Sequence, residues 1–169
     1  MHLYSRRGAI ALAVTLAAVA CSDTLSDAVI PGFYATLSGD QIVGAVGGTG
    51  SGTINFTTGA DSGLTVSASS ITGLSGTPTE IAIYVGSQTA NGTKRADICG
   101  GSAPACAASI TAGTAVTMLT GFTKGQLYTA LHTYGGGYVT VGTALKPAPA
   151  SATAGGELRG VIVFNPLTQ

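Results

Sequence analysis

Hydrophobic and polar residues alternate along much of the chain from Phe33 onward. Residues 52–58, GTINFTT, place Ile54 and Phe56 on one face and polar side chains on the other. Successive side chains of a β-strand point to opposite faces, so this period of two is typical of a strand with one buried face. The pattern predicts a sheet that covers an apolar core.

Similar short runs recur between clusters of glycine, proline, asparagine and aspartate, which favour turns. The expected strands cover residues 33–38, 52–58, 64–71, 80–85, one or two segments within 107–119, 127–134, 138–145 and 158–164. Three glycines at 135–137 separate two of these runs and predict a hairpin. About seven to nine short strands predict an all-β antiparallel fold, either an immunoglobulin-like β-sandwich or a Greek-key barrel.

The N-terminal segment has a different pattern. Arg6 and Arg7 precede an uncharged, mostly apolar run from Gly8 to Ala20 that ends in small residues. This run is shorter than the ~20 apolar residues that a membrane-spanning helix requires. The order of basic, apolar and small residues predicts a secretory signal peptide over residues 1–20.

Cys21 follows the apolar run directly. The tetrapeptide AVAC, residues 18–21, resembles the lipobox of bacterial lipoproteins, in which the cysteine thiol is lipidated and becomes the mature N-terminus. An ordinary secretory signal with an unmodified cysteine is the alternative. Ser22, rather than aspartate, follows the cysteine, and by the usual sorting rule this favours the outer membrane. We expect residues 21–31 to form the lipidated cysteine and a tether, and residues 32–166 to form one β domain.

The chain is poor in charge: 8% of its residues are charged, and seven basic residues balance seven acidic ones. No basic patch of the kind that binds nucleic acid is present in the sequence. The expected partners are therefore the membrane, through the N-terminal lipid, and another envelope or extracellular protein. No cofactor is expected.

Cys99 and Cys106 enclose a short loop of small and turn-forming residues, GGSAPA. Disulfides persist in the compartments that exported proteins reach, so a disulfide between these cysteines is expected. Metal binding is the alternative, but a zinc site takes at least three protein ligands, and the chain beyond the signal peptide has only one histidine. We expect no metal site.

Three polar residues stand out as a candidate binding or structural cluster: His132, Glu157 and Arg159. On a strand, Glu157 and Arg159 share a face and lie roughly 7 Å apart. The arginine then folds back onto the carboxylate, or both side chains meet partners on an adjacent strand. His132 is either a half-buried, hydrogen-bonded residue or part of a binding surface whose charge changes near neutral pH.

A hydrolytic enzyme is an alternative that the sequence does not favour. Ser75, in GLSGT, is the nearest match to a nucleophile elbow, but Thr77 stands where the second glycine belongs. His132 is the only imidazole base after the signal peptide, and Glu157 is the acid that such a site would use. No residue is therefore nominated as catalytic.

Three segments resemble the chordin-type domain family, known as CHRD. Residues 155–162, GGELRGVI, are similar to its closing GEIRG signature, residues 33–43, FYATLSGDQIV, to its opening motif, and residues 125–133, GQLYTALHT, to its strand ending in His-Thr. The resemblance implies an extracytoplasmic, β-sandwich-like module; in chordin such modules belong to a secreted protein that binds growth factors. The family's His-x-His strand is replaced here by Ala82 and Tyr84, which argues against a metal or ligand role carried by those histidines.

Together these observations predict a non-enzymatic cell-envelope lipoprotein with a CHRD-like β domain that binds a protein or serves a structural role. A module that binds a small ligand or a metal, and a hydrolytic enzyme, are the alternatives.

Overall fold

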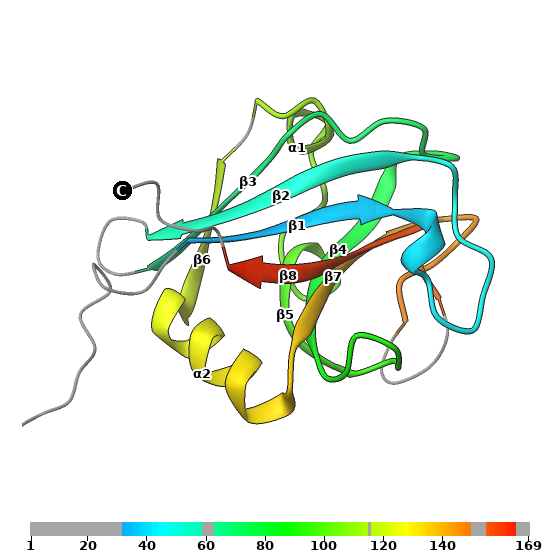
Figure 1. The fold of residues 1–169 in the computed structure, drawn as a ribbon. Helices are drawn as coiled ribbons and strands as arrows, with labels where there is room; N and C mark the ends of the chain where they lie inside the picture. Colours follow the sequence, from blue (N-terminus) through cyan, green and yellow to red (C-terminus); the bar gives the residue numbers. More distant parts are fainter. Residues whose placement is uncertain (1–31, 59–62, 115, 150–154, 165–169) are drawn as a thin grey trace, which may run out of the picture.

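The computed structural model describes residues 32–58, 63–114, 116–149 and 155–164. The predicted signal peptide, Cys21 and the tether lie outside these residues. Within them the fold is all-β, as predicted, with eight antiparallel strands in a single sheet and few helices (Figure 1). The strands are β1 (Phe33–Ser38), β2 (Ser51–Thr58), β3 (Gly63–Ala68), β4 (Pro78–Val85), β5 (Thr93–Gly100), β6 (Val116–Thr123), β7 (Gly137–Thr143) and β8 (Leu158–Phe164). The helices are the 3₁₀ turn η1 (Gly39–Gln41), α1 (Ala108–Thr111) and α2 (Lys124–Tyr134).

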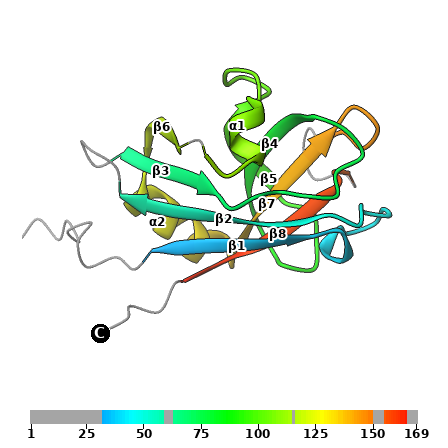
Figure 2. The same ribbon diagram turned by 90° about the horizontal axis from the view of Figure 1, so that it is seen from above.

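The strand order is β5-β4-β7-β8-β1-β2-β3-β6. The edge strands β5 and β6 come close to each other, so the sheet is rolled into a nearly closed, barrel-like shape. Seen from above, β1, β2 and β3 run beside one another, and β4 and β7 cross them at an angle (Figure 2). All described strand pairs belong to this one sheet, rather than to two separate sheets. The last strand, β8, lies between β1 and β7.

Side chains from the concave face of the sheet fill the core. The alternation predicted for β1, β2 and β3 is confirmed, because every second residue of β1 and β3 is buried, as are Ile54 and Phe56 of β2. The side chains from β1 and β2 in this core are Phe33, Ala35, Leu37, Ile54 and Phe56. In contrast, β7 is buried along its whole length, and β4 over its last five residues. Loops cover the outer face of these two strands, where Ala82, Tyr84 and Tyr138 form a second, smaller cluster.

The strand predicted for residues 127–134 is wrong, because these residues belong to helix α2. Thr123 and Gln126 form a capping box at its start, each side chain bonding the other residue's backbone N–H. Gly135, with a φ of 71°, ends the helix in the left-handed conformation that glycine adopts readily. The expected hairpin at residues 135–137 is therefore also wrong: the glycines join a helix to β7. The buried side of α2 includes Leu127 and Leu131, which pack on the core.

Two further expectations about strands are corrected. Residues 108–111, within a segment predicted as strand, form the short helix α1. Strand β5 was not predicted, because its sequence TKRADICG carries three charged residues and alternates poorly. It lies at an edge of the sheet, a position where charged side chains are tolerated and discourage further strand pairing. None of the helices in the described ranges has the length and apolar character needed to cross a bilayer.

Candidate functional site

His132, Glu157 and Arg159 do not form one cluster. Glu157 directly precedes β8, whereas the ring of His132 lies 6.2 Å from that of Phe164, the last residue of β8. A strand of this length spans roughly 20 Å at 3.3 Å per residue. The three polar residues therefore occupy separate environments.

Glu157 is buried at the beginning of β8 and acts as a hydrogen-bond acceptor. Its Oε1 accepts from the backbone N–H of Ser75 at 2.6 Å. Its Oε2 accepts from the hydroxyl groups of Ser75, at 2.8 Å, and Thr143, at 2.7 Å. Burial alone raises the pKa of Glu157, but the hydrogen bonds from Thr143 and Ser75 and the positive charge of Lys146 outweigh burial, so the pKa lies below its usual value. The carboxylate is thus held in its charged form.

The backbone around Glu157 is also tightly tied. The Gly48 N–H donates to the Glu157 carbonyl oxygen at 2.6 Å, and the Glu157 N–H donates to the Val141 carbonyl oxygen at 2.7 Å. A Cβ atom at Gly48 would lie 2.6 Å from Cγ of Glu157, so only glycine fits there without a shift. Lys146 Nζ holds the same loop through the carbonyl oxygen of Val46, at 2.9 Å. Glu157 therefore connects the loop before β2, the segment before β4 and the end of β7.

The contact between Ser75 and Glu157 bears on the hydrolase alternative. The hydroxyl group of Ser75 donates to the Glu157 carboxylate. No hydrogen bond in the described part of the chain joins His132 to Ser75 or to Glu157; the rings of Tyr128 and Phe164 are its neighbours. The imidazole is thus separate from the serine that sequence reasoning paired with it.

Arg159 lies on the outer face of β8 and is 1% exposed. Its guanidinium carbon lies 3.5 Å from the centre of the Tyr138 ring. The Tyr138 ring stacks in turn on Tyr84, with centroids 5.2 Å apart and planes inclined by 1°. Register explains the stack: Tyr84 and Tyr138 are directly paired across β4 and β7, while Arg159 is paired with Thr140, the residue two after Tyr138.

The loop of residues 86–92, between β4 and β5, covers this stack. Arg159 Nη2 donates to the carbonyl oxygens of Ser87 (3.4 Å), Gln88 (3.1 Å) and Ala90 (3.0 Å). The Tyr138 hydroxyl accepts from the Gly92 N–H at 2.6 Å. Arg159 therefore fastens the loop to the sheet.

The guanidinium group of Arg159 is not fully satisfied. Its Nε and Nη1 atoms are buried and have no hydrogen-bond partner among the described residues. Burial lowers the pKa of Arg159, and the interaction with Tyr138 opposes this effect. The Tyr84 hydroxyl, in the same outer cluster, donates to the Pro149 carbonyl oxygen. Burial, followed by the negative charge of Glu80, raises the pKa of Tyr84 above its usual range.

Glu157 and Arg159 each have a partner on β7, and no described hydrogen bond or ion pair joins them to each other. Ion pairs connect Lys94 with Glu80 (3.3 Å) and with Asp97 (3.0 Å). Ala82 and Tyr84, at the positions compared with the family's His-x-His strand, are buried in the outer cluster. In the described ranges, no group of three or more histidine, cysteine or acidic side chains could hold a metal ion.

Cys99 and Cys106 lie at the end of β5 and in the loop after it, with their sulfur atoms 2.07 Å apart, as in a disulfide. Asp97 holds the intervening loop by accepting from the N–H (2.9 Å) and the hydroxyl (2.6 Å) of Ser102. Gly101 has a φ of 57°, and a Cβ there would lie 2.7 Å from the Asp97 carboxylate. The disulfide thus closes a loop that is already held by local hydrogen bonds.

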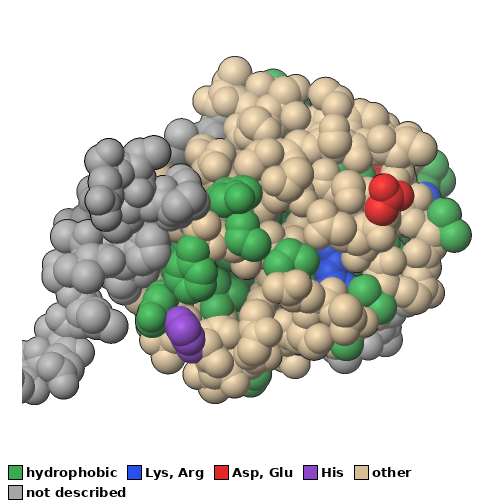
Figure 3. Space-filling view, in the orientation of Figure 1, with side chains coloured by type: hydrophobic (Ala, Val, Ile, Leu, Met, Phe, Trp, Pro, Cys, Tyr) green, Lys and Arg blue, Asp and Glu red, His purple; other side chains and the backbone are tan. Residues whose placement is uncertain are grey.

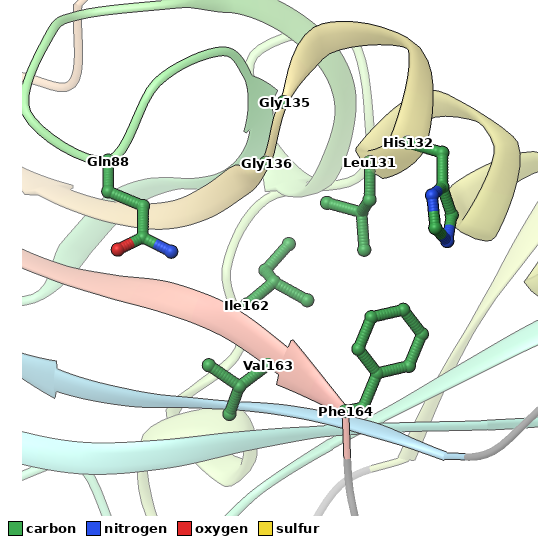
Figure 4. Close-up of a pocket in the computed structure, with 8 residues that line it drawn as sticks. All are labelled: Gln88, Leu131, His132, Gly135, Gly136, Ile162, Val163 and Phe164. Carbon is green, nitrogen blue, oxygen red and sulfur yellow. The ribbon is translucent and has the colours of Figure 1, made fainter.

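His132 lies on the exposed side of α2, at the rim of a pocket with a volume of about 350 Å³ (Figure 4). Leu131, Ile162, Val163 and Phe164 supply its apolar walls, and Gln88 extends into it from the loop of residues 86–92. On the corresponding face of the molecule, hydrophobic side chains gather beside a histidine (Figure 3). We call the pocket lined by these residues the α2–β8 pocket.

Sequence reasoning missed the α2–β8 pocket because it placed residues 127–134 in a strand. The signals of the helix were present: Thr123 and Gln126 have the spacing of a capping box, and Leu127, Ala130, Leu131 and Tyr134 recur at helical spacing. Gln88 had no signal of its own, because its place in the pocket depends on the path of a loop.

No protein-family model, no curated protein and no solved structure matches the chain.

Proposed function

We propose that the chain is an exported, non-enzymatic cell-envelope lipoprotein whose β domain binds another protein or serves a structural role. The observation that carries this proposal is that Glu157 and Arg159 both make hydrogen bonds within the domain. Both side chains bond other parts of the domain: Glu157 bonds Ser75, before β4, and Thr143, at the end of β7, and Arg159 bonds the loop of residues 86–92. The two charged residues that sequence reasoning singled out are thus engaged in holding the domain together.

The proposal includes a CHRD-like domain with a Greek-key barrel or immunoglobulin-like architecture. Its support is the contact between the opening and closing segments of the resemblance: Ser38 pairs with Arg159, and the Val161 N–H donates to the Gln41 side chain at 3.1 Å. The segment at residues 125–133 supports it less, because it is helical here whereas the family's segment is a strand. The single rolled sheet favours a barrel over a two-sheet sandwich.

A surface for a protein partner is offered by two strongly exposed side chains, Val46 (86% exposed) and Leu145 (75% exposed). Lys146 brings the two loops together through its bond to the Val46 carbonyl oxygen. This bond keeps the two loops close, and we propose that Val46 and Leu145 form one apolar surface that associates with another protein. The candidate partner is another envelope or extracellular protein.

Photo-crosslinking in the native envelope tests this surface. A crosslinking residue at Leu145 is expected to give one defined adduct. The same residue at exposed Thr57, on β2, is the control and is expected to give none. Equal labelling from both positions, or no adduct from Leu145, would contradict binding through this surface.

Membrane attachment is proposed to occur through a lipid on Cys21, in the outer membrane. Mass spectrometry of the mature protein is expected to find an acylated Cys21 at the N-terminus. Cys21→Ser is expected to leave the protein unprocessed or to release it from the membrane fraction. A mature wild-type protein without an acyl group would overturn the lipoprotein proposal and leave an ordinary exported protein.

A further inference from the structure

We infer that the α2–β8 pocket binds a small, uncharged molecule with a flat apolar body and one hydrogen-bonding group. This inference does not rest on the lipid anchor or on a protein partner. The volume of the pocket, about 350 Å³, lies within the range of small-molecule sites, about 300–1,000 Å³. Such sites combine mostly apolar walls with a few polar groups that fix the orientation of the ligand.

The apolar walls come from two elements that are distant in sequence. Leu131 projects from α2, and Ile162, Val163 and Phe164 come from the end of β8 (Figure 4). Phe164 is 42% exposed although it is a large aromatic residue. Its ring belongs to an aromatic group with Phe33, at 5.1 Å, and Tyr128, at 5.8 Å. These contacts hold the ring in place, so it offers a preformed surface for stacking.

A flat ligand is favoured by the opposite wall. Gly135 and Gly136 line the pocket where α2 turns into β7, and they present backbone rather than side chains. The Gly86 N–H donates to the Gly136 carbonyl oxygen at 3.0 Å, which fixes this wall to the covering loop. A planar body can therefore approach the peptide backbone closely on one side and the Phe164 ring on the other.

Two polar side chains set the chemistry of the ligand's functional group. The amide of Gln88 and the imidazole of His132 lie on opposite sides of the pocket (Figure 4). Of the described residues that line it, none is lysine, arginine, aspartate or glutamate. An ionised ligand would lose hydration there without gaining an opposite charge, so an uncharged hydroxyl or carbonyl group is the better match.

Arg159 acts here as a positioning residue. It does not line the pocket, but its Nη2 atom holds the backbone carbonyl of Gln88 at 3.1 Å. The same Nη2 atom donates a hydrogen bond to the Ala90 carbonyl oxygen at 3.0 Å, so the loop of residues 86–92 is fixed against the sheet. The pocket therefore keeps its shape before a ligand arrives, which lowers the cost of binding.

The test uses 1-naphthol as the probe, because it is flat, apolar and carries one hydroxyl group. Methyl NMR spectra are recorded on the full chain carrying Cys21→Ser, which has no acyl chain, and only shifts of methyl groups that line the pocket count as binding there. Saturable shifts are expected for the methyl groups of Leu131, Ile162 and Val163. The methyl groups of Ile54, in the core, are expected to stay unchanged. 1-Naphthoate, which is ionised at neutral pH, is expected to bind at least tenfold more weakly.

Two tryptophan variants in the covering loop provide the matched comparison. Gln88→Trp fills the pocket and is expected to weaken 1-naphthol binding at least tenfold. Ala90 is exposed in the same loop and does not line the pocket, so Ala90→Trp is expected to bind as the wild type does. Three results would overturn the inference: no saturable binding, shifts centred on other methyl groups, or equal losses in the two variants. Tighter binding of 1-naphthoate would overturn the uncharged ligand class.

Discussion

The guanidinium carbon of Arg159 lies 3.5 Å from the centre of the Tyr138 ring, and this ring stacks on Tyr84. The three side chains come from neighbouring strands β8, β7 and β4, and they lie on the outer face of the rolled sheet. The loop of residues 86–92 closes over them through bonds to Arg159 and Tyr138. The domain therefore has a second packed layer outside its core, organised around one buried cation.

Arg159→Lys is expected to lower the free energy of unfolding by about 1–3 kcal/mol. Lysine keeps the charge, but its compact ammonium group cannot stack flat on the Tyr138 ring as the planar guanidinium group does. Urea melts measure the loss, and amide hydrogen exchange is expected to become faster in residues 86–92. Arg95→Lys is the control, because Arg95 is exposed on β5; it is expected to change stability by less than about 0.5 kcal/mol. Equal stability of Arg159→Lys and wild type would show that the stack contributes little.

Removing the disulfide with the double change Cys99→Ser and Cys106→Ala is expected to lower the free energy of unfolding by about 2–3 kcal/mol and to leave the fold intact. The disulfide closes a short loop, so the entropy that it removes from the unfolded chain is limited. The bonds between Asp97 and Ser102 remain and keep the loop in place. A thiol reductant is expected to lower the unfolding free energy of the wild-type protein to that of the double variant. It is expected to leave the stability of the double variant unchanged. Loss of folded structure in the variant would mean that the disulfide is essential to the fold.

Acid is expected to remove the contribution of Glu157 to stability. Because the folded-state pKa lies below the ordinary value of 4.5, the carboxylate stabilises the fold fully above that value. The contribution is lost as the pH falls through the lower pKa of the folded state, where the unfolded chain has already bound its proton. The difference in unfolding free energy between wild type and Glu157→Gln is therefore expected to be constant near neutral pH and to shrink below about pH 4.5. Asp97 also has a lowered pKa, but it titrates in both proteins and cancels in this difference. A difference that does not change with pH would contradict the role given to the Glu157 charge.

The inner layer of the fold follows closely from the sequence. In β1, β2 and β3 one face meets the core and the other meets solvent, so burial and sequence alternate together. β7 is buried on both faces, and its strand character was predicted from its valine, threonine and tyrosine residues rather than from alternation. What the sequence does not show is the loop that covers its outer face.

Helix α2 illustrates a conflict between two local signals. Tyrosine, threonine and three following glycines favour strands and a hairpin, whereas the capping box and the spacing of Leu127, Ala130 and Leu131 favour a helix. The core decides between them, because Leu127 and Leu131 are both buried against it only when they lie on one side of a helix. The α2–β8 pocket exists only because residues 124–134 form a helix, so it could not be predicted while these residues were assigned to a strand.

The polar residues of the candidate site were identified from composition, but their partners were not. Glu157 and Arg159 stand out in a chain with few charges. The partners are reached only through the fold, since Ser75 is 82 residues from Glu157 and Gln88 is 71 residues from Arg159. Sequence spacing left two alternatives, a direct pair or partners on an adjacent strand, and the structure shows the second: Glu157 and Arg159 each have a partner on β7, in two separate networks.

We conclude that Glu157 and Arg159 hold the domain together through separate networks, and one mutant cycle tests this claim. Urea melts are recorded for wild type, Glu157→Gln, Arg159→Met and the double variant, with Asp40→Asn as the control for an exposed acidic residue. Each single change is expected to lower the unfolding free energy by about 1–3 kcal/mol, because it leaves buried polar partners unsatisfied. The double variant is expected to lose the sum of the two within about 0.5 kcal/mol, since the residues share no partner. Wild-type midpoints in both single variants would contradict the claim and would assign these residues to a binding surface instead.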